Sequence, residues 1–381
     1  MRILFSLHHY LDPNQGAPGV TLSLGQALET AGCQVEYFGF EHAFPKSKTG
    51  SIGNSIRFPW QLSSFLKHHG KRFNIVDVST GDNWVWAAQG RHGGRKHQAL
   101  ITRSHGLEHT VDANVRFDAR KSTTSLSWKY PLYHGGYRLW EVAKSLQLAD
   151  MALMLNQHDL DYAVQKLRVM PERVRLIENG IPDQFLGLPI DDMEQASQTE
   201  VRIAQVGSYI TRKGIMYSCK ALNSVLARHP QVTMTFLGTG CPEVQVYADF
   251  DPAVQGQIKV VPRFAREELP NLLRGHQIFL FPSLSEGFSL ALPEAMSCGL
   301  APVATDIPGN VEIAKNERNA LLVPPRDSDA IKQALDRLIA NPVLLHRLRQ
   351  EAYTTAQHYG WARIASDTLK LYEEALQKRP L

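Results

Sequence analysis

Residues 277–305, QIFLFPSLSEGFSLALPEAMSCGLAPVAT, decide the fold of this chain. The opening QIFLFP is an apolar run that predicts a buried strand, and the closing APVAT predicts a second strand. Between them, a small polar loop holds Glu286 and Gly287, and a helix is predicted to begin near Pro293, since proline suits a first helical turn. A strand, a helix and a second strand in succession predict a parallel sheet covered by helices.

The same alternation extends along nearly the whole chain. Further strands are predicted at 2–7, 34–40, 74–79, 99–106, 151–156, 173–179, 201–207, 232–238, 258–262 and 319–324. Further helices are predicted at 20–32, 58–70, 157–168, 214–228, 266–274, 328–340, 342–358 and 361–377. This pattern predicts an α/β protein with two Rossmann-like domains.

The length and a change in composition indicate how the chain is divided. A chain of 381 residues is expected to form roughly two to three domains. Residues 186–200 are polar and acidic without a clear period, and we interpret them as a linker between domains at 1–185 and 201–358. We expect the two domains to face each other across a cleft at the carboxyl ends of their strands, where open α/β sheets bind ligands.

The composition is that of a globular protein, with 43% hydrophobic and 20% charged residues. The 41 Lys and Arg against 37 Asp and Glu give a net charge of +4, which suits an anionic ligand but not nucleic acid. No stretch reaches the ~18 apolar residues of a membrane span, and the apolar start of the chain is too short for a secretory signal. The four cysteines form no C-x-x-C pair, so we expect a reduced, cytoplasmic protein without a metal site.

The loop and helix of the opening segment combine features of an anion site with two carboxylates. Backbone N–H groups at the start of a helix attract anions, and Gly287 lets the main chain approach a ligand closely. Glu286 and Glu294 suit a role as acceptors for sugar hydroxyls, because ionised carboxylates accept strong hydrogen bonds. The spacing alone is weak, since Glu294 could merely complement the helix dipole and Glu286 could be an exposed loop charge.

The wider context resembles the retaining glycosyltransferases of family 4, which have the two-domain GT-B architecture. Their signature pairs two glutamates eight positions apart, the first followed by Gly-Phe, as in Glu286, Gly287, Phe288 and Glu294. The resemblance continues through the motifs VRIAQVG at 201–207, RKG at 212–214, FLGTG at 236–240, ENGI at 178–181 and NALLVPPRD at 319–327. It covers about 147–377 and is weaker over 1–40. The last helix at 361–377 resembles the family's helix that crosses back to the first domain.

The resemblance implies a role for each matching residue on the donor side. Glu286 would bind hydroxyls of the donor sugar, and Glu294 would hold the ribose diol of the nucleotide. Lys213 would neutralise the diphosphate. The loop residues that would contact the sugar and the diphosphate, chiefly through the main chain, are Gly287, Phe288, Ser289 and Leu290. The family usually has an arginine where this chain has Ser208, and Arg212 is either its substitute or a solvated charge at a helix start.

The N-terminal domain contributes two further candidates. The segment QGAPGV at 15–20 corresponds to a Gly-rich loop of the family that faces the diphosphate and the acceptor; Gly16 matches and Ala17 replaces the second glycine. The same segment could equally be an ordinary turn. His105, in SHG at the end of a predicted strand, resembles the family's histidine that hydrogen-bonds the sugar, although a lone histidine is often structural. The other fourteen histidines show no comparable placement.

The family chemistry implies transfer of a hexosyl group from a UDP- or GDP-sugar to a hydroxyl of a sugar or glycolipid acceptor. Anomeric configuration would be retained, with the departing phosphate accepting the acceptor's proton, so that neither a cofactor, a metal ion nor a protein base is needed. Lys213 and Arg212 would stabilise the charge that grows on the phosphate. An inverting enzyme would need a base, for which His105 or Asp12 would be suitable.

Other functions share parts of this pattern. A nucleotide-sugar epimerase of the same fold, or a non-catalytic protein that binds sugar nucleotides, would use the same donor residues. A glycoside hydrolase also uses two carboxylates but needs no phosphate site. A dinucleotide oxidoreductase is poorly supported, because no G-x-G-x-x-G follows the first strand.

The segment 116–144 is rich in cations and aromatic residues. They are Arg116, Arg120, Lys121, Lys129, Arg138 and Lys144 with Trp128, Tyr130, Tyr133, Tyr137 and Trp140. One interpretation is an ordinary pair of amphipathic helices whose cations extend to solvent. The other is a surface that meets anionic lipid or an anionic acceptor at the inner face of a membrane.

Overall fold

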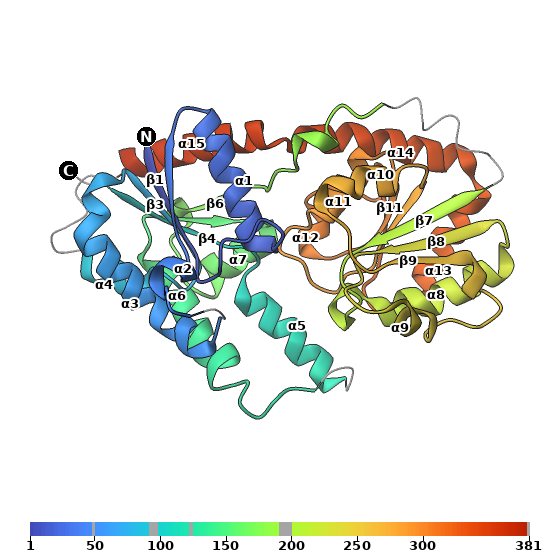
Figure 1. Ribbon diagram of the computed structural model, residues 1–381, viewed down its shortest axis with the longest axis horizontal. Helices are drawn as coiled ribbons and strands as arrows, with labels where there is room; N and C mark the ends of the chain where they lie inside the picture. Colours follow the sequence, from blue (N-terminus) through green and yellow to red (C-terminus); the bar gives the residue numbers. More distant parts are fainter. Residues whose placement is uncertain (48–49, 91–97, 122–124, 190–199, 379–381) are drawn as a thin grey trace. The chain divides into compact units, whose positions relative to one another are not determined.

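The computed structural model describes residues 1–47, 50–90, 98–121, 125–189 and 200–378, which fold into two compact units (Figure 1). Unit 1 comprises Met1–Gly180 and Trp361–Leu381, and unit 2 comprises Ile181–Gly360. Each unit contains a six-stranded sheet in which every pairing between neighbouring strands is parallel. The predicted α/β class with two Rossmann-like sheets is confirmed. Most of the predicted linker, residues 190–199, lies outside the described residues.

The sheet of unit 1 has the order β2-β1-β3-β4-β5-β6. Its strands are β1 (Arg2–Ser6), β2 (Gln34–Phe38), β3 (Ile75–Ser79), β4 (Ala99–Arg103), β5 (Met151–Met154) and β6 (Val174–Leu176). The chain passes from β1 to one side for β2 and then returns to the other side for β3. The crevice beyond the carboxyl ends of β1 and β3 is therefore a topological switch point, the usual place for a ligand in an open α/β sheet.

Helices cover both faces of this sheet. They are α1 (Gly16–Thr30), α2 (Phe40–Ala43), α3 (Ile52–His69), α4 (Trp84–Gly90), α5 (Glu108–Arg120), α6 (Arg138–Leu148), α7 (Gln157–Gln165) and α15 (Trp361–Gln377). Helices α1 and α15 pack together on one face, and α4 packs against both α3 and α6 on the opposite face (Figure 1). A buried apolar cluster under α3 and α4 includes Phe38, Phe58, Leu62 and Trp86.

The C-terminal helix α15 is held in unit 1 by a buried polar triad. The Tyr372 hydroxyl donates to Asp77 Oδ2 at 2.5 Å, and the same oxygen accepts a bond from Arg103 Nη2 at 2.7 Å. Asp77 and Arg103 lie on the neighbouring strands β3 and β4, so the helix is tied directly to the centre of the sheet. Because every charged or polar member is paired, the triad satisfies the rule for buried polar groups.

The predicted glycine loop at 15–20 is largely helical. Helix α1 begins at Gly16, so Pro18 falls in the first turn, where a missing N–H costs nothing. A Cβ on Gly16 would meet no atom within 4 Å, whereas a Cβ on Gly19 would lie 2.5 Å from the carbonyl oxygen of Pro13. The fold therefore requires the glycine at 19, where the preceding loop crosses close to the helix.

The sheet of unit 2 has the order β12-β11-β10-β7-β8-β9, the doubly wound order of a Rossmann sheet. Its strands are β7 (Val201–Val206), β8 (Val232–Leu237), β9 (Ile258–Val261), β10 (Ile278–Phe281), β11 (Ala301–Thr305) and β12 (Leu321–Val323). The order reverses between β7 and β10. The loops that follow these two strands therefore flank the switch point of unit 2.

The helices of unit 2 are α8 (Ile215–Arg228), α9 (Glu243–Tyr247), α10 (Leu269–Leu273), α11 (Ala291–Ser297), α12 (Pro308–Val311), α13 (Ser328–Ala340) and α14 (Pro342–Ala356). Helix α8 packs beside α13, and α11 packs beside α14 (Figure 1). Among the helices that the structure describes in either unit, none combines the length and the apolar character that a membrane span requires.

Candidate functional site

Two loops at the switch point of unit 2 are joined by their main chains. The loop after β7 runs to Gly214, and the loop after β10 begins at Pro282. The Leu284 N–H donates to the Arg212 carbonyl at 2.8 Å. Gly214 has φ +72°, and a Cβ there would lie 2.0 Å from the Pro282 carbonyl oxygen, so only glycine allows this approach. The two loops are therefore held close together, and so are the side chains that they carry.

These loops bring the predicted cations and the first predicted carboxylate together. Lys213 Nζ lies 2.6 Å from Glu286 Oε1, and Arg212 Nη1 lies 3.3 Å from the same oxygen. Arg212 Nη1 also donates to the Ser285 carbonyl at 3.0 Å. The side chains of Lys213 and Glu286 are only 16% and 10% exposed, so this contact is less screened than a surface ion pair. The cluster carries two positive charges against one carboxylate, a surplus that suits an anionic ligand.

The second predicted carboxylate has a partner that the sequence did not reveal. Glu294 on α11 is buried, and Arg266 Nη2 donates to its Oε1 at 2.8 Å. Burial raises the pKa of Glu294, while Arg266 opposes that shift by stabilising the charged form. Within the described residues, Oε2 has no hydrogen-bond partner, so the carboxylate retains an acceptor for a further donor. The two residues lie 28 positions apart, and no spacing rule connects them.

The main chain between the two carboxylates offers donors. The backbone N–H groups of Phe288, Ser289 and Leu290 donate no hydrogen bond to any residue that the structure describes. The Phe288 ring packs against Tyr359 with 5.9 Å between centroids, which anchors the loop. A Cβ on Gly309 would lie 2.4 Å from the Glu286 carbonyl oxygen, so this glycine also shapes the loop. Unpaired N–H groups of this kind are available as hydrogen-bond donors to a phosphate.

Unit 1 contains a cavity of about 410 Å³ at its own switch point. The residues that line it follow β1, β3 and β4 or lie on the helices nearby: His8, His9, Ala17, Phe40, Ile52, Ser55, Ser79, Thr80, His105, Gly106, Glu108, Tyr133, His134 and Arg138. His105, which was predicted to contact a sugar, is therefore one of the residues that line this cavity. Gly16 is exposed at the start of α1, and the lining residue there is its neighbour Ala17.

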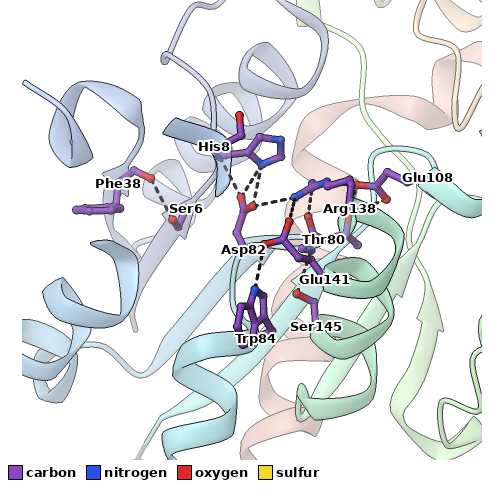
Figure 2. Close-up of polar contacts among 12 residues, drawn as sticks. Ser6, His8, Phe38, Thr80, Asp82, Trp84, Glu108, Arg138, Glu141 and Ser145 are labelled. Atoms are coloured by element: carbon purple, nitrogen blue, oxygen red, sulfur yellow. Dashed lines mark hydrogen bonds and ion pairs between the residues drawn. The ribbon is translucent and has the colours of Figure 1, made fainter. Parts of the chain in front are cut away.

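A buried carboxylate organises the wall of this cavity. Asp82 is fully buried and accepts hydrogen bonds from the His8 main chain at 3.0 Å and from His8 Nδ1 at 2.8 Å (Figure 2). Burial alone would raise the pKa of Asp82, but His8 and Arg138 together hold it below its ordinary value. Because an ionised carboxylate only accepts, His8 carries its proton on Nδ1 when neutral and keeps Nε2 as an acceptor.

Arg138 lies at the centre of the same network. Its Nη2 donates to the Thr80 carbonyl at 2.7 Å and to Glu108 Oε1 at 3.0 Å, and its Nη1 lies 3.4 Å from Asp82 Oδ1 (Figure 2). Glu141 Oε2 is 3.8 Å from the same nitrogen. The prediction that Arg138 belongs to a basic surface is wrong, since this residue is only 8% exposed.

Beside this network, the buried Glu141 and the half-buried imidazoles of His9 and His105 have shifted pKa values. Burial raises the pKa of Glu141 to about 7, although Arg138 and the Trp84 N–H, which donates at 3.2 Å, both favour the charged form. Burial lowers the pKa of His105 to about 3, helped by the nearby charge of Arg103. Burial and His8 lower the pKa of His9 to about 4. Both imidazoles are therefore neutral at neutral pH.

Most of this network was not predicted from the sequence. No placement comparable to that of His105 was predicted for any other histidine, but His8 and His9 line the same cavity. A signal was available: His8 follows the first strand, Asp82 the third and His105 the fourth, and parallel strands end at one edge of a sheet. Asp12, the other base considered for inversion, does not line the cavity and binds Asn14 and Gln15 instead.

The fold and the two switch-point sites define a two-unit α/β protein of the GT-B class. The solved sucrose-phosphate synthase from Thermosynechococcus elongatus superposes with a TM-score of 0.78 at 20% identity, over 100% of both chains. At this identity the likeness establishes the fold alone.

Two family models match the chain. The model described as Glycosyltransferase Family 4 matches residues 15–185, and the model described as Glycosyl transferases group 1 matches residues 190–355. The chain therefore belongs to the family 4 glycosyltransferases, as its motifs indicated.

Curated relatives agree with this assignment. The α-maltose-1-phosphate synthase of Mycolicibacterium smegmatis is 27% identical over 306 residues, which are 72% of this chain and 75% of that protein. The UDP-Gal:α-D-GlcNAc-diphosphoundecaprenol α-1,3-galactosyltransferase of Escherichia coli is 26% identical over 204 residues, 50% of this chain and 52% of that protein. For several of these relatives, the chain spans only about half of their length.

Proposed function

We propose that this protein transfers a hexosyl group from a UDP- or GDP-sugar to an acceptor hydroxyl, with retention of the anomeric configuration. The observation that carries the proposal is the cluster of Lys213, Arg212 and Glu286 beside the unpaired N–H groups of residues 288–290 at the switch point of unit 2. Cations and amide donors suit a diphosphate, and carboxylates suit the hydroxyls of the sugar and the ribose.

In the proposed reaction, the acceptor oxygen forms a bond to the anomeric carbon as the bond from that carbon to the diphosphate oxygen breaks. Negative charge grows on the leaving diphosphate, where Lys213, Arg212 and the amides of 288–290 would stabilise it. The acceptor's proton passes to a phosphate oxygen on the same face of the sugar. This route gives retention and requires neither a protein base nor a metal ion.

The other residues have supporting roles in this proposal. When the donor binds, the Lys213 ammonium group would contact the diphosphate. Glu286 would then accept hydrogen bonds from hydroxyls of the donor sugar in place of part of its contact with Lys213. Glu294 would hold the ribose diol through the oxygen that Arg266 leaves free. His105, in unit 1, would hydrogen-bond a sugar through a neutral imidazole.

The acceptor is proposed to be a sugar or a glycolipid, supported by the lipid-linked acceptor named for the Escherichia coli relative. Unit 1 also exposes apolar side chains beside cations: Trp128 is 78% and Leu132 is 67% exposed, and Lys129 Nζ lies 5.5 Å from the Trp128 ring centroid. This arrangement supports peripheral contact with an anionic membrane. Flotation with anionic liposomes should exceed that with neutral ones and fall in Trp128→Ser; equal flotation would refute the contact.

A nucleotide-sugar screen tests the donor site. A UDP- or GDP-sugar should raise the melting temperature of the native protein, since ligand that binds only the folded state stabilises it, and Glu286→Ala and Lys213→Ala should reduce the shift. Turnover followed by NMR should give a product with the donor's anomeric configuration, and EDTA should not slow it. An epimerase would instead change the sugar nucleotide without an acceptor, and a binding protein would show the thermal shift without turnover.

A further inference from the structure

The lining of the unit 1 cavity carries little net charge, and its arginine is already paired with acidic residues. Apart from its histidines, the acidic and basic residues of this lining are Glu108 and Arg138. Both terminal nitrogens of Arg138 are engaged, one by Thr80 and Glu108 and the other by Asp82. An anion entering the cavity would therefore have to displace Glu108 or remain beside its carboxylate.

Buried carboxylates behind the wall add to this effect. Asp82 and Glu141 are both fully buried within reach of Arg138, so the guanidinium faces the carboxylates of Asp82 and Glu108 and the acid of Glu141, which is partly ionised at neutral pH because its pKa is about 7. His8, when protonated, supplies at most one further positive charge. The potential at the wall thus disfavours a second anionic group, because like charges in a poorly solvated site repel strongly.

The same lining is rich in neutral hydrogen-bonding groups. His9 and His105 are neutral, and their rings make no hydrogen bond to any residue that the structure describes; the buried Nδ1 of His9 is among the unsatisfied atoms. A neutral imidazole has one donor and one acceptor nitrogen, which matches a hydroxyl group, itself both donor and acceptor. Unsatisfied polar atoms in a cavity call for a ligand or water that completes them.

An apolar wall completes the cavity. Phe40, Tyr133 and Ile52 line it together with the polar groups. The C–H face of a sugar ring packs on such side chains while its hydroxyls reach the imidazoles. The volume of about 410 Å³ falls within the usual range for small-molecule sites.

We propose that the unit 1 cavity binds an uncharged, hydroxyl-rich saccharide ring and discriminates against a ring that bears a phosphate. That this saccharide is the acceptor rests on the proposed function; the preference for an uncharged ring rests only on the cavity. Glu108 sets the preference in this account, because it occupies Arg138 and repels an anion.

Direct binding to the whole protein without nucleotide tests the proposal. The methyl α-glycosides of glucose, mannose and galactose are titrated beside their 6-phosphates, and the ring nitrogens of His9 and His105 are followed by NMR with ¹⁵N-labelled histidine. At least one uncharged glycoside should shift both rings and bind on the order of tenfold more tightly than its phosphate. Equal or tighter binding of the phosphates, or no shift with any glycoside up to about 100 mM, would overturn the proposal.

A pair of variants tests the role assigned to Glu108. Glu108→Gln should reduce the discrimination by about tenfold through tighter binding of the phosphate, because one unit of repulsion is removed. Glu172→Gln changes an exposed carboxylate of unit 1 outside the cavity and should leave it unchanged. If Glu108→Gln leaves the ratio as it is in a folded protein, the electrostatic argument is wrong.

Nucleotide binding in the same samples separates the two proposals. Glycoside binding at the histidines without UDP or GDP binding would leave the cavity assignment standing and refute the donor site. UDP or GDP binding with no glycoside preference would leave the donor site and refute the cavity assignment.

Discussion

Removing the ammonium group of Lys213 tests the assignment of the diphosphate site. Lys213 Nζ lies 2.6 Å from Glu286 Oε1 in a contact that is mostly shielded from water, and Arg212 is a second cation at 3.3 Å. Lys213→Ala therefore removes one of the two cations and leaves Glu286 less well neutralised. A hydrogen bond to a charged group contributes about 1.5–3 kcal/mol, so UDP or GDP should bind about 10- to 150-fold more weakly.

Turnover should fall further than affinity. Charge on the diphosphate grows in the transition state, and removal of one preorganised donor from such a site costs about 10²–10³ in kcat. Calorimetry with UDP and GDP measures the loss of affinity, and initial rates at saturating donor measure kcat. The double variant Lys213→Ala, Glu286→Gln should recover part of the nucleotide affinity, because the unneutralised carboxylate no longer repels the diphosphate, but it should not recover kcat.

A matched control isolates the site from general charge effects. Lys220 is an exposed lysine on α8 of the same unit, and Lys220→Ala should leave both affinity and rate close to those of the native protein. The reasoning would be refuted if Lys213→Ala bound UDP and GDP as tightly as the native protein, or if Lys220→Ala lost as much affinity.

Three further substitutions test other parts of the structure. Because the pKa of Glu141 is raised from 4.5 to about 7, the folded state binds an extra proton between these pH values, and its stability falls as the pH rises through them. In urea titrations, the free energy of unfolding of the native protein, relative to that of Glu141→Gln, should therefore drop by up to about 3 kcal/mol between pH 5 and pH 8. A difference that stays constant with pH would contradict the assignment. Tyr372→Phe should destabilise the protein by about 1–3 kcal/mol in the same assay, since Asp77 loses a buried donor; an unchanged midpoint would count against the triad. Gly309→Ala should weaken nucleotide-sugar binding at least severalfold in a thermal-shift titration while the fold persists, because its Cβ would meet the Glu286 main chain, and undiminished binding would argue against that loop geometry.

The strands and the donor loops could be predicted from sequence because local patterns encode them. The apolar run that became β10 and the short polar loop after it carry their own signals, and Lys213 and Glu286 each lie in the loop that follows such a run. Some helices begin a few residues away from the predicted start, because proline can occupy more than one position in a first helical turn. Helix α11, for example, was predicted to begin near Pro293 and begins at Ala291.

The sequence places His8, Asp82 and His105 after strands, but the contacts of the buried polar groups in unit 1 could not be predicted, because strand order decides which of them meet. Asp82 and Arg138 lie 56 positions apart, and Tyr372 lies 295 positions from Asp77. A single sequence gives the strands but not which of them are neighbours. Both interpretations of 116–144, a pair of amphipathic helices and a membrane-facing surface, placed its cations toward the outside, whereas Arg138 is buried among carboxylates.

A structure determined with bound UDP or GDP tests the central claim most directly. We predict that the diphosphate contacts Lys213 and the N–H groups of residues 288–290, and that the ribose hydroxyls bind the free oxygen of Glu294. A nucleotide bound away from the loops that follow β7 and β10, or carboxylates of Glu286 and Glu294 that make no contact with it, would contradict the account.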